Sequence, residues 1–293
     1  MGANGFRRLK PAPIPAIAPV PEDAATGRLK DVYESTKCGL GVPWMGVVAM
    51  AFARYPTFYD TLWSGLEPIV RTAAFSAACQ DLRNAAEAQA AELRPASLIN
   101  DVSASGYRPA ELDEIRDVIE MFSSGNMPYI LMATLGRLLL EGTTWSGGNE
   151  TGPSLSPKAP YGRPVLMEPH HADSGTQAVF EQVKRTLDLP FVNTDYRALA
   201  RWPSYFARAW QDMERIVRDP AYERAVGTVH RRARDLAEGL PNPIGLTAEQ
   251  LRQAAKQDAS TCEVLDVVRL FQWLLPGLAV NVACLRAQLA KPS

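Results

Sequence analysis

The feature that most constrains this chain is an internal repeat. Val32–Trp44 has the sequence VYESTKCGLGVPW and Val179–Phe191 has VFEQVKRTLDLPF, so that Val, Glu, Lys, Leu and Pro coincide. The second segment begins 147 residues after the first (179 − 32), and Ala53–Arg71 matches Ala200–Arg218 at the same spacing. Because two collinear matches share one spacing, the chain of 293 residues is predicted to contain one folding unit twice.

A third and looser match pairs Asp117–Phe122 with Asp266–Phe271 at a spacing of 149 residues (266 − 117). Between the two copies lies a stretch rich in Gly, Pro and Ser, and so many turn-forming residues exclude regular structure there. The sequence therefore predicts an N-terminal helical repeat at 1–141, a linker at 142–175 and a C-terminal helical repeat at 176–293.

Local signals along both copies are helical. Thr72–Leu93 is rich in alanine and other strong helix formers, and Pro109 is followed by acidic residues, as at a helix start. Thr247 and Gln250 have the spacing of a capping box. Since no segment alternates with a period of two residues, we expect an all-α fold, a pseudo-dimer of two helical repeats with a pocket between them.

Composition excludes several classes of protein. The chain has 31 basic and 32 acidic residues, so it has no surplus of positive charge with which to bind nucleic acid. Prolines interrupt the apolar runs near the N-terminus, which predicts no signal peptide, and the apolar stretch Val264–Ala290 is broken by polar residues, which predicts a buried core helix and no membrane span. Four cysteines without a CxxC pair suit neither a zinc site nor a dithiol redox motif, and without a signal peptide or membrane span we expect them to be reduced, in a cytoplasmic protein.

The histidines give no metal prediction. His170 and His171 lie near Asp173, but adjacent histidines rarely face one ion, and this segment belongs to the predicted linker. His230 begins a basic run, HRRAR, and is predicted to lie on a solvated helix face. We therefore expect neither a metal nor another cofactor.

A site confined to one copy should appear where the copies differ in chemistry. Asp195 stands where the first copy has Val48. If the valine position is buried, Asp195 is desolvated, which would raise its pKa and make it a better general base. The alternative is an ordinary acidic residue at the start of a helix over Tyr196–Arg201.

Asn126 is the second difference, since its counterpart is Leu275. Gly125 and Pro128 flank it and are predicted to break an otherwise apolar helical run. A break inside a buried helix points to a nearby ligand. The alternative is a plain turn in which Asn126 adopts a left-handed conformation.

Three of these segments carry a family resemblance. The VPW of Val42–Trp44, the SGNMPY of Ser124–Tyr129 and the DYRALARWP of Asp195–Pro203 resemble the DehI-type, or group I, 2-haloacid dehalogenases, and the likeness runs over nearly the whole chain. The resemblance implies an all-α pseudo-dimer that hydrolyses D- and L-2-haloalkanoic acids to 2-hydroxyalkanoic acids with inversion at the α-carbon. Substrate, water and the released halide would be its only small-molecule partners.

By this resemblance Asp195 matches the catalytic aspartate, and Asn126 matches the asparagine that helps to hold the reacting water. The chemistry is reasonable on its own terms. Water is a weak nucleophile, so a carboxylate must take its proton as it attacks the saturated carbon, without an ester intermediate. An amide can both donate to and accept from that water, which would fix its orientation.

Further residues are candidates for substrate binding, because they match the family's motifs or lie beside them: Trp44, Val47, Thr72, Tyr129 and Thr194. Trp44 would line the pocket, with a plain core position as the alternative, and Val47 stands where the family tends to place a bulky apolar residue. Thr72 matches a threonine implicated in some members, which have a glutamate four residues later; here that residue is Ser76. Tyr129 and Thr194 are donors that the substrate carboxylate could use.

Two other functions remain open at this stage. An AhpD-like peroxidase or decarboxylase is also all-α, but it would need a CxxC pair or a His–Cys relay, which the chain lacks. A non-enzymatic helical-repeat binding module predicts no polar residues between the halves. Because Trp44 and Asn126 belong to the first half and Asp195 to the second, the predicted pocket is shared by both halves. An isologous homodimer is the default expectation for a soluble oligomer.

Overall fold

Helices account for the regular structure of this protein. The computed structural model describes residues 6–149, 152–153 and 162–290, and over these residues it contains α-helices and short 3₁₀ turns but no strand. The predicted all-α class is therefore confirmed. Part of the predicted linker, 150–151 and 154–161, lies outside the described residues, and its described part contains only one 3₁₀ turn, Pro169–His171, before the next helix begins at Ser174.

The order of helices runs along the chain twice. The first four are α1 (Gly27–Leu40), α2 (Val47–Phe52), α3 (Pro56–Leu66) and α4 (Ala73–Glu92). The helices that begin 147 residues after these are α7 (Ser174–Leu187), α8 (Thr194–Leu199), α9 (Pro203–Arg218) and α10 (Pro220–Gly239). The first series ends with α5 (Ile99–Ala104) and α6 (Pro109–Leu140), and the second with α11 (Ala248–Asp258) and α12 (Thr261–Gln288). This order supports the duplication, which stays an inference from the sequence.

The helices group into two compact units, neither of which coincides with a half of the sequence. Unit 1 comprises residues 1–82, 125–160 and 230–277, and unit 2 comprises residues 83–124, 161–229 and 278–293. Each unit draws on both halves of the chain, because α4, α6, α10 and α12 each contribute a part to both units. The predicted boundaries at 1–141, 142–175 and 176–293 describe the repeats in the sequence and stay a prediction.

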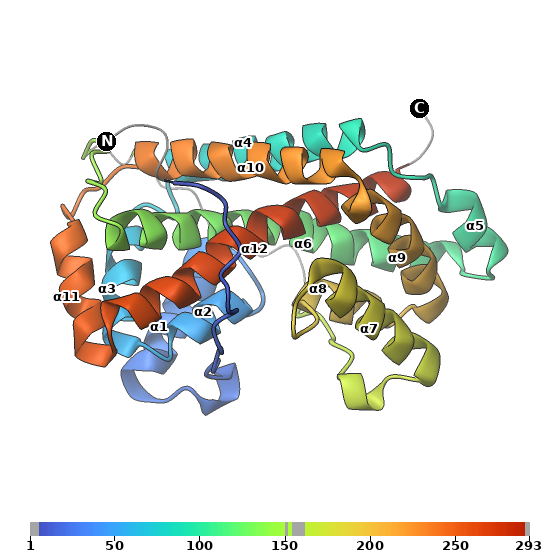
Figure 1. The fold of residues 1–293 in the computed structure, drawn as a ribbon, viewed down its shortest axis with the longest axis horizontal. Helices are drawn as coiled ribbons and strands as arrows, with labels where there is room; N and C mark the ends of the chain where they lie inside the picture. Colours follow the sequence, from blue (N-terminus) through green and yellow to red (C-terminus); the bar gives the residue numbers. More distant parts are fainter. Residues whose placement is uncertain (1–5, 150–151, 154–161, 291–293) are drawn as a thin grey trace. The chain divides into compact units, whose positions relative to one another are not determined.

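In unit 1, α3 packs against α1, α2 and α11 (Figure 1). Pro56 begins α3, where its missing N–H costs nothing and its fixed φ favours the helix. The backbone N–H of Phe58, which has no partner within the first turn, donates to Oδ2 of Asp258 on α11 at 2.8 Å. Trp63 is buried against α1 and donates from Nε1 to Oγ of Ser35 at 3.0 Å. The first half of the chain is thus joined to α11 of the second.

The helix boundaries predicted from local signals are confirmed. α4 spans Ala73–Glu92 where Thr72–Leu93 was predicted, and α6 begins at Pro109. The predicted capping box opens α11: Gln250 N donates to Oγ1 of Thr247 at 3.2 Å, and Thr247 N donates to Oε1 of Gln250 at 2.8 Å. These contacts join residues three positions apart, which is why the sequence alone predicts them.

α12 is the longest apolar segment of the chain. By length and composition it could cross a membrane, and it is the one described helix of which this holds. However, 89% of its most apolar window is buried within the protein. This burial is that of a core helix, as predicted for Val264–Ala290.

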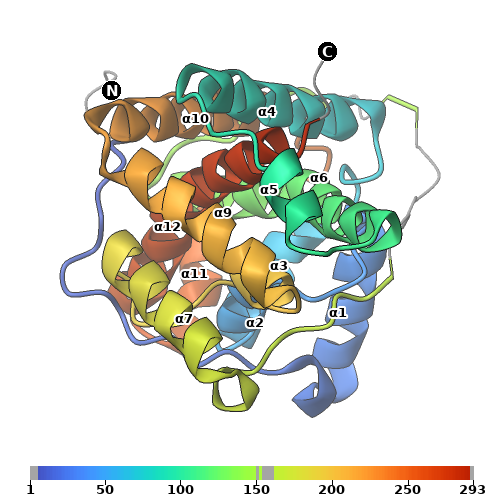
Figure 2. The same ribbon diagram turned by 90° about the vertical axis from the view of Figure 1, so that its right-hand side faces the viewer.

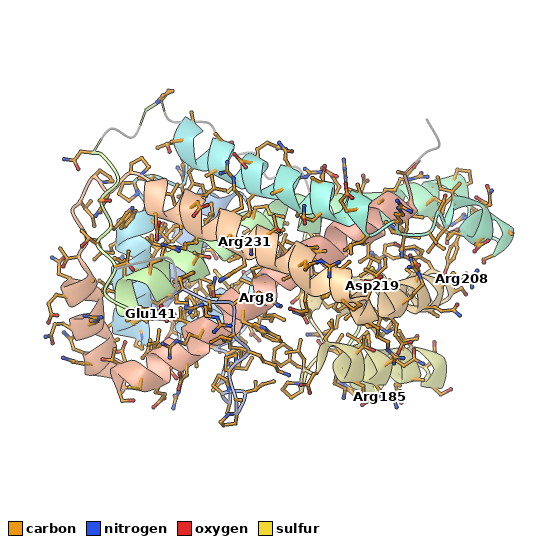
Figure 3. All side chains as sticks on the ribbon, turned by 45° about the horizontal axis from the view of Figure 1, so that its top comes forward. Arg8, Glu141, Arg185, Arg208, Asp219 and Arg231 are labelled. Carbon is orange, nitrogen blue, oxygen red and sulfur yellow. The ribbon has the colours of Figure 1, made fainter. Side chains whose placement is uncertain are left out.

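His230 corrects a prediction, because it is buried in unit 1 and not solvated. Only 2% of the residue is exposed, since the N-terminal arm covers it and Phe6 stacks on its ring with the centroids 5.5 Å apart. Gln272 donates from Nε2 to Nδ1 at 3.1 Å, and Oε1 of the same amide accepts from Arg137 at 2.6 Å. Burial, reinforced by nearby arginines such as Arg8 (labelled in Figure 3) and Arg137, lowers the pKa of His230 to about 3.

This buried imidazole makes stability depend on pH. Because its folded-state pKa of about 3 lies below the unfolded value of about 6.5, the unfolded chain binds the proton first as pH falls. Stability is therefore lost progressively from about pH 6.5 downwards, by at most about 1.4 kcal/mol per pH unit for one proton. We expect His230→Asn, which keeps an acceptor for Gln272, to flatten this slope in urea unfolding measured between pH 7 and 4.5.

The matched control is His171→Asn, because His171 is exposed in a 3₁₀ turn. Its slope should equal that of the wild type. An unchanged slope in His230→Asn would contradict the assignment of a buried neutral imidazole.

In unit 2, α9 packs against α7 and α8, and Figure 2 shows α7 and α9 side by side. α7 begins with Asp173, whose Oδ1 accepts from the backbone N–H of Thr176 at 2.8 Å and so caps the helix. α9 has one continuous apolar face, and its Trp210 is buried. Arg208, labelled in Figure 3, extends from α9 and donates to Oδ2 of Asp101 on α5 at 3.0 Å.

Four charged side chains in unit 2 link the C-terminal part of α4, the N-terminal part of α6 and the C-terminal part of α12. Arg83 donates to Glu87 at 2.9 Å and to Glu120 at 2.6 Å, and Arg286 donates to Glu87 at 3.1 Å and to Glu120 at 2.9 Å. Burial would raise the pKa of Glu120, but the hydrogen bonds from both arginines more than offset it, so that this pKa lies below its ordinary value. The two arginines and two glutamates together carry no net charge.

Candidate active site

Five predicted site residues belong to unit 1, and they lie on three segments: the loop that leads into α2 and the first residue of that helix, the residue before α4, and the middle of α6. They are Trp44, Val47, Thr72, Asn126 and Tyr129. Trp44 is buried in the loop, and Gly46 is the N-cap residue of α2. Val47, the first residue of α2, is half-buried.

The predicted break around Asn126 is wrong, and so is the alternative of a turn. α6 continues from Pro109 to Leu140, and Pro128 lies inside it. The proline removes one N–H, which would otherwise donate to the carbonyl of Ser124. One missing bond does not end this helix, because Asn126 is only 5% exposed, the residues on either side of it are buried, and their packing stabilises the helix.

Gly125 has a different role from the one predicted. Its backbone is helical, and a Cβ at this position would collide with Cη2 of the Trp44 indole. The glycine therefore lets the indole lie directly against the backbone of α6, one residue from Asn126. The same residue that suggested a broken helix marks a close contact between two segments.

Tyr129 is joined to the same loop through its hydroxyl group. Its Oη accepts from the backbone N–H of Gly46 at 2.8 Å and donates to the backbone oxygen of Trp44 at 3.1 Å. The rings of Tyr129 and Trp44 are 6.5 Å apart, centroid to centroid. Burial raises the pKa of this phenol well above its ordinary value, so that it stays protonated.

The hydroxyl group of Thr72 is hydrogen-bonded to the backbone on both sides of the start of α4. Its hydroxyl donates to the backbone oxygen of Ile69 at 2.7 Å and accepts from the backbone N–H of Phe75 at 3.3 Å. Ser76, one turn later, is exposed. The geometry therefore gives Thr72 the role of a local helix cap, and its contact with substrate stays a prediction.

Asp195 and Thr194 belong to unit 2, where they form the first turn of α8. Asp195 is 3% exposed, and its counterpart Val48 on α2 is likewise 3% exposed. The condition set by the sequence comparison is thus met, because the valine position and the aspartate position are both buried. Asp195 is also an acidic residue of a first helical turn, which the partial positive charge of the helix start favours.

Asn193 is a further candidate that the sequence patterns did not single out. It is the N-cap residue of α8, yet its side chain does not cap the helix. It is buried, and its Oδ1 is among the buried oxygens that have no hydrogen-bond partner within the described part of the chain. Such an atom, two residues before Asp195, is a candidate for binding water or substrate. The available signal was the repeat itself, since the counterpart of Asn193 is Gly46.

The structure thus brings Trp44 and Tyr129 into contact in unit 1, with Asn126 on the same stretch of α6. Asp195 and Thr194 stand together on α8 in unit 2. The single pocket shared by the two halves stays a prediction.

A separate pocket of about 530 Å³ lies within unit 2, between α4, α6 and α12. Glu87, Glu120 and Arg286 of the charged network are part of its lining, and none of the predicted site residues is. Within residues 6–149, 152–153 and 162–290, no three His, Cys, Asp or Glu side chains are grouped so that they could hold a metal ion.

Comparison with known proteins identifies the family. The model of the family described as "Halocarboxylic acid dehydrogenase DehI" matches residues 42–188. The (R)-2-haloacid dehalogenase of Rhizobium sp. (strain NHG3) is 46% identical over 83% of this chain and 96% of that protein. The chain belongs to the DehI family of 2-haloacid dehalogenases. The family predicted from the VPW, SGNMPY and DYRALARWP segments is therefore confirmed.

Other DehI-type relatives cover most of the chain. The (R)-2-haloacid dehalogenase of Pseudomonas putida is 34% identical over 98% of both chains. A protein of Alcaligenes xylosoxydans xylosoxydans named "2-haloacid dehalogenase, configuration-inverting" is 26% identical over 88% of both. The solved structure of a D-2-haloacid dehalogenase mutant with D-2-CPA is similar with a TM-score of 0.83, at 32% identity, over 94% of this chain and 97% of that one.

Proposed function

We propose that this DehI-family member hydrolyses 2-haloalkanoic acids to 2-hydroxyalkanoic acids with inversion at the α-carbon. A water molecule attacks the carbon opposite the departing halide, and Asp195 takes the proton of that water. No ester forms on the enzyme. Relatives named 2-haloacid dehalogenases, one of them described as configuration-inverting, support this reaction.

The single observation that carries the proposal is the burial of Asp195 at a position where the first copy has the buried Val48. Removing a carboxylate from bulk water disfavours its charged form, which makes it a better acceptor for the proton of the attacking water. Asn126, also buried, supplies an amide that both donates and accepts, which suits a water molecule held for attack. Trp44 gives the departing halide an apolar contact and a weak hydrogen-bond donor.

Stereochemistry is the finer part of the proposal. The relatives that are 46% and 34% identical are named for the (R) enantiomer, whereas the family resemblance of the motifs implies action on both. The proposed pocket takes the (R) enantiomer, and reaction of the (S) enantiomer stays a prediction.

The experiment is to incubate the protein separately with each enantiomer of 2-chloropropionate and to measure chloride and the configuration of the lactate. We expect (R)-2-chloropropionate to give chloride and (S)-lactate in equal amounts. A peroxidase or a binding module would release no chloride, and lactate of retained configuration would overturn the single-displacement mechanism.

A single turnover in ¹⁸O-water tests whether an ester intermediate exists. Direct attack by water places the label in lactate. Label in the carboxylate of Asp195 after proteolysis and mass spectrometry would instead indicate an aspartyl ester.

A further inference from the structure

We propose that Gly125 and Tyr129 of α6 form a clamp that fixes Trp44 and the start of α2, and that Tyr129 is a positioning residue and not a ligand of the substrate carboxylate. The clamp itself follows from contacts within unit 1. Its effect on catalysis rests on the proposed function, in which Trp44 lines the substrate pocket.

The hydroxyl of Tyr129 has no proton left for a substrate. A phenol has one proton to donate and two lone pairs that accept. The proton is donated to the backbone oxygen of Trp44 at 3.1 Å, and one lone pair accepts from the N–H of Gly46 at 2.8 Å. A carboxylate can only accept, so Tyr129 could bind it only by giving up its hydrogen bond to the Trp44 oxygen.

These two hydrogen bonds join the backbone on either side of Met45, at the end of the loop that leads into α2, to one hydroxyl group of α6. Gly46 is also the N-cap of α2, and its carbonyl accepts from the N–H of Met50 at 3.1 Å. The Tyr129 hydroxyl therefore determines where α2 begins, and with it the position of Val47, the first residue of that helix.

Close packing completes the clamp. A Cβ on Gly46 would lie 2.8 Å from Cζ of Tyr129, and one on Gly125 would collide with the Trp44 indole. Residues 125 and 129 are four apart on α6 and so share one face of the helix. The Trp44 indole is thus held against the face of α6 that carries Gly125 and Tyr129. Asn126 is the residue after Gly125 on the same helix. One helix fixes Trp44 relative to the residue proposed to hold the water.

The direct test is hydrogen–deuterium exchange of Trp44–Val47 in the substrate-free protein, read by mass spectrometry. Tyr129→Phe removes the acceptor of the Gly46 N–H, so we expect exchange in this segment to be at least about tenfold faster than in the wild type. The matched control is Tyr55→Phe. Tyr55 is buried in the same unit, but its hydroxyl donates to Oε1 of Glu263 on α12 at 2.9 Å and not to the loop, so exchange of Trp44–Val47 should be unchanged.

Kinetics separate positioning from substrate binding. A misplaced Trp44 lowers kcat, and we expect a loss of about 10- to 100-fold in Tyr129→Phe, with little change in the inhibition constant of propionate, an unreactive carboxylate. Unchanged exchange together with a parallel rise in KM and in the inhibition constant of propionate would overturn the proposal and make Tyr129 a substrate ligand.

Gly125→Ala provides a second test if Tyr129→Phe does not fold. Its methyl group displaces the indole and leaves the Tyr129 hydroxyl intact, so kcat should fall as in Tyr129→Phe; wild-type kcat would contradict the clamp. The exchange experiment needs no substrate. If the wild-type protein released no halide, the proposed function would fail while faster exchange in Tyr129→Phe still supported the clamp.

Discussion

Asp195→Asn should reduce halide release from 2-chloropropionate by about 10³-fold, the scale that a general base contributes. The amide has nearly the same shape as the carboxylate but cannot take the proton of the attacking water. Since the residue is buried in α8, the isosteric change preserves packing, and we expect the far-ultraviolet circular dichroism and the melting temperature to stay close to those of the wild type. Chloride release measured at saturating substrate gives kcat directly.

Asp173→Asn is the matched control for this experiment. Asp173 also stands at a helix start in unit 2, where its Oδ1 accepts from the N–H of Thr176, and asparagine caps helices equally well. The control should retain full activity. A kcat for Asp195→Asn within tenfold of the wild type would remove Asp195 from the role of base.

Asn126→Leu should lower kcat by about 10²-fold, with a smaller effect on KM. The substitution introduces the residue that the second copy carries at the matching position, Leu275, and it nearly conserves volume. What it removes is the amide that would hold the water in line with the carbon, and loss of orientation costs rate more than binding. Initial rates over a range of substrate concentrations separate the two parameters.

Thr134→Val on the same helix tests whether any loss of buried polarity has this effect. Thr134 is fully buried in α6, and its Oγ1 has no partner among the described residues, so the exchange for valine should be neutral or slightly stabilising. Equal losses of kcat in both variants would mean that Asn126 acts through packing and not through a bound water.

Local signals in the sequence were sufficient to predict the helical class and the starts of several helices. The capping box of Thr247 and Gln250, and the proline that begins α6 at Pro109, depend on residues within one turn of each other. The repeat went further, because the pairing of Asp195 with Val48 alone singled out a carboxylate that the fold buries.

Long-range packing is where prediction from the sequence failed. The basic run around His230 indicated a solvated face, but Phe6, more than two hundred residues away, stacks on that ring. Gly125 and Pro128 indicated a break, although α6 runs through both. A helix whose surroundings are buried tolerates one missing hydrogen bond, because packing contributes more to its stability than propensity does.

The helical class, the family, the repeat and the candidate pair Asp195 and Asn126 follow from the order of residues alone. The division into compact units that draw on both halves of the chain, and the hydrogen bond of Tyr129 to the loop at Trp44, arise only in the folded chain. Both differences have one cause. Helix starts and stops are set by neighbours in the chain, whereas burial and the partner of a polar group are set by residues that only folding brings together.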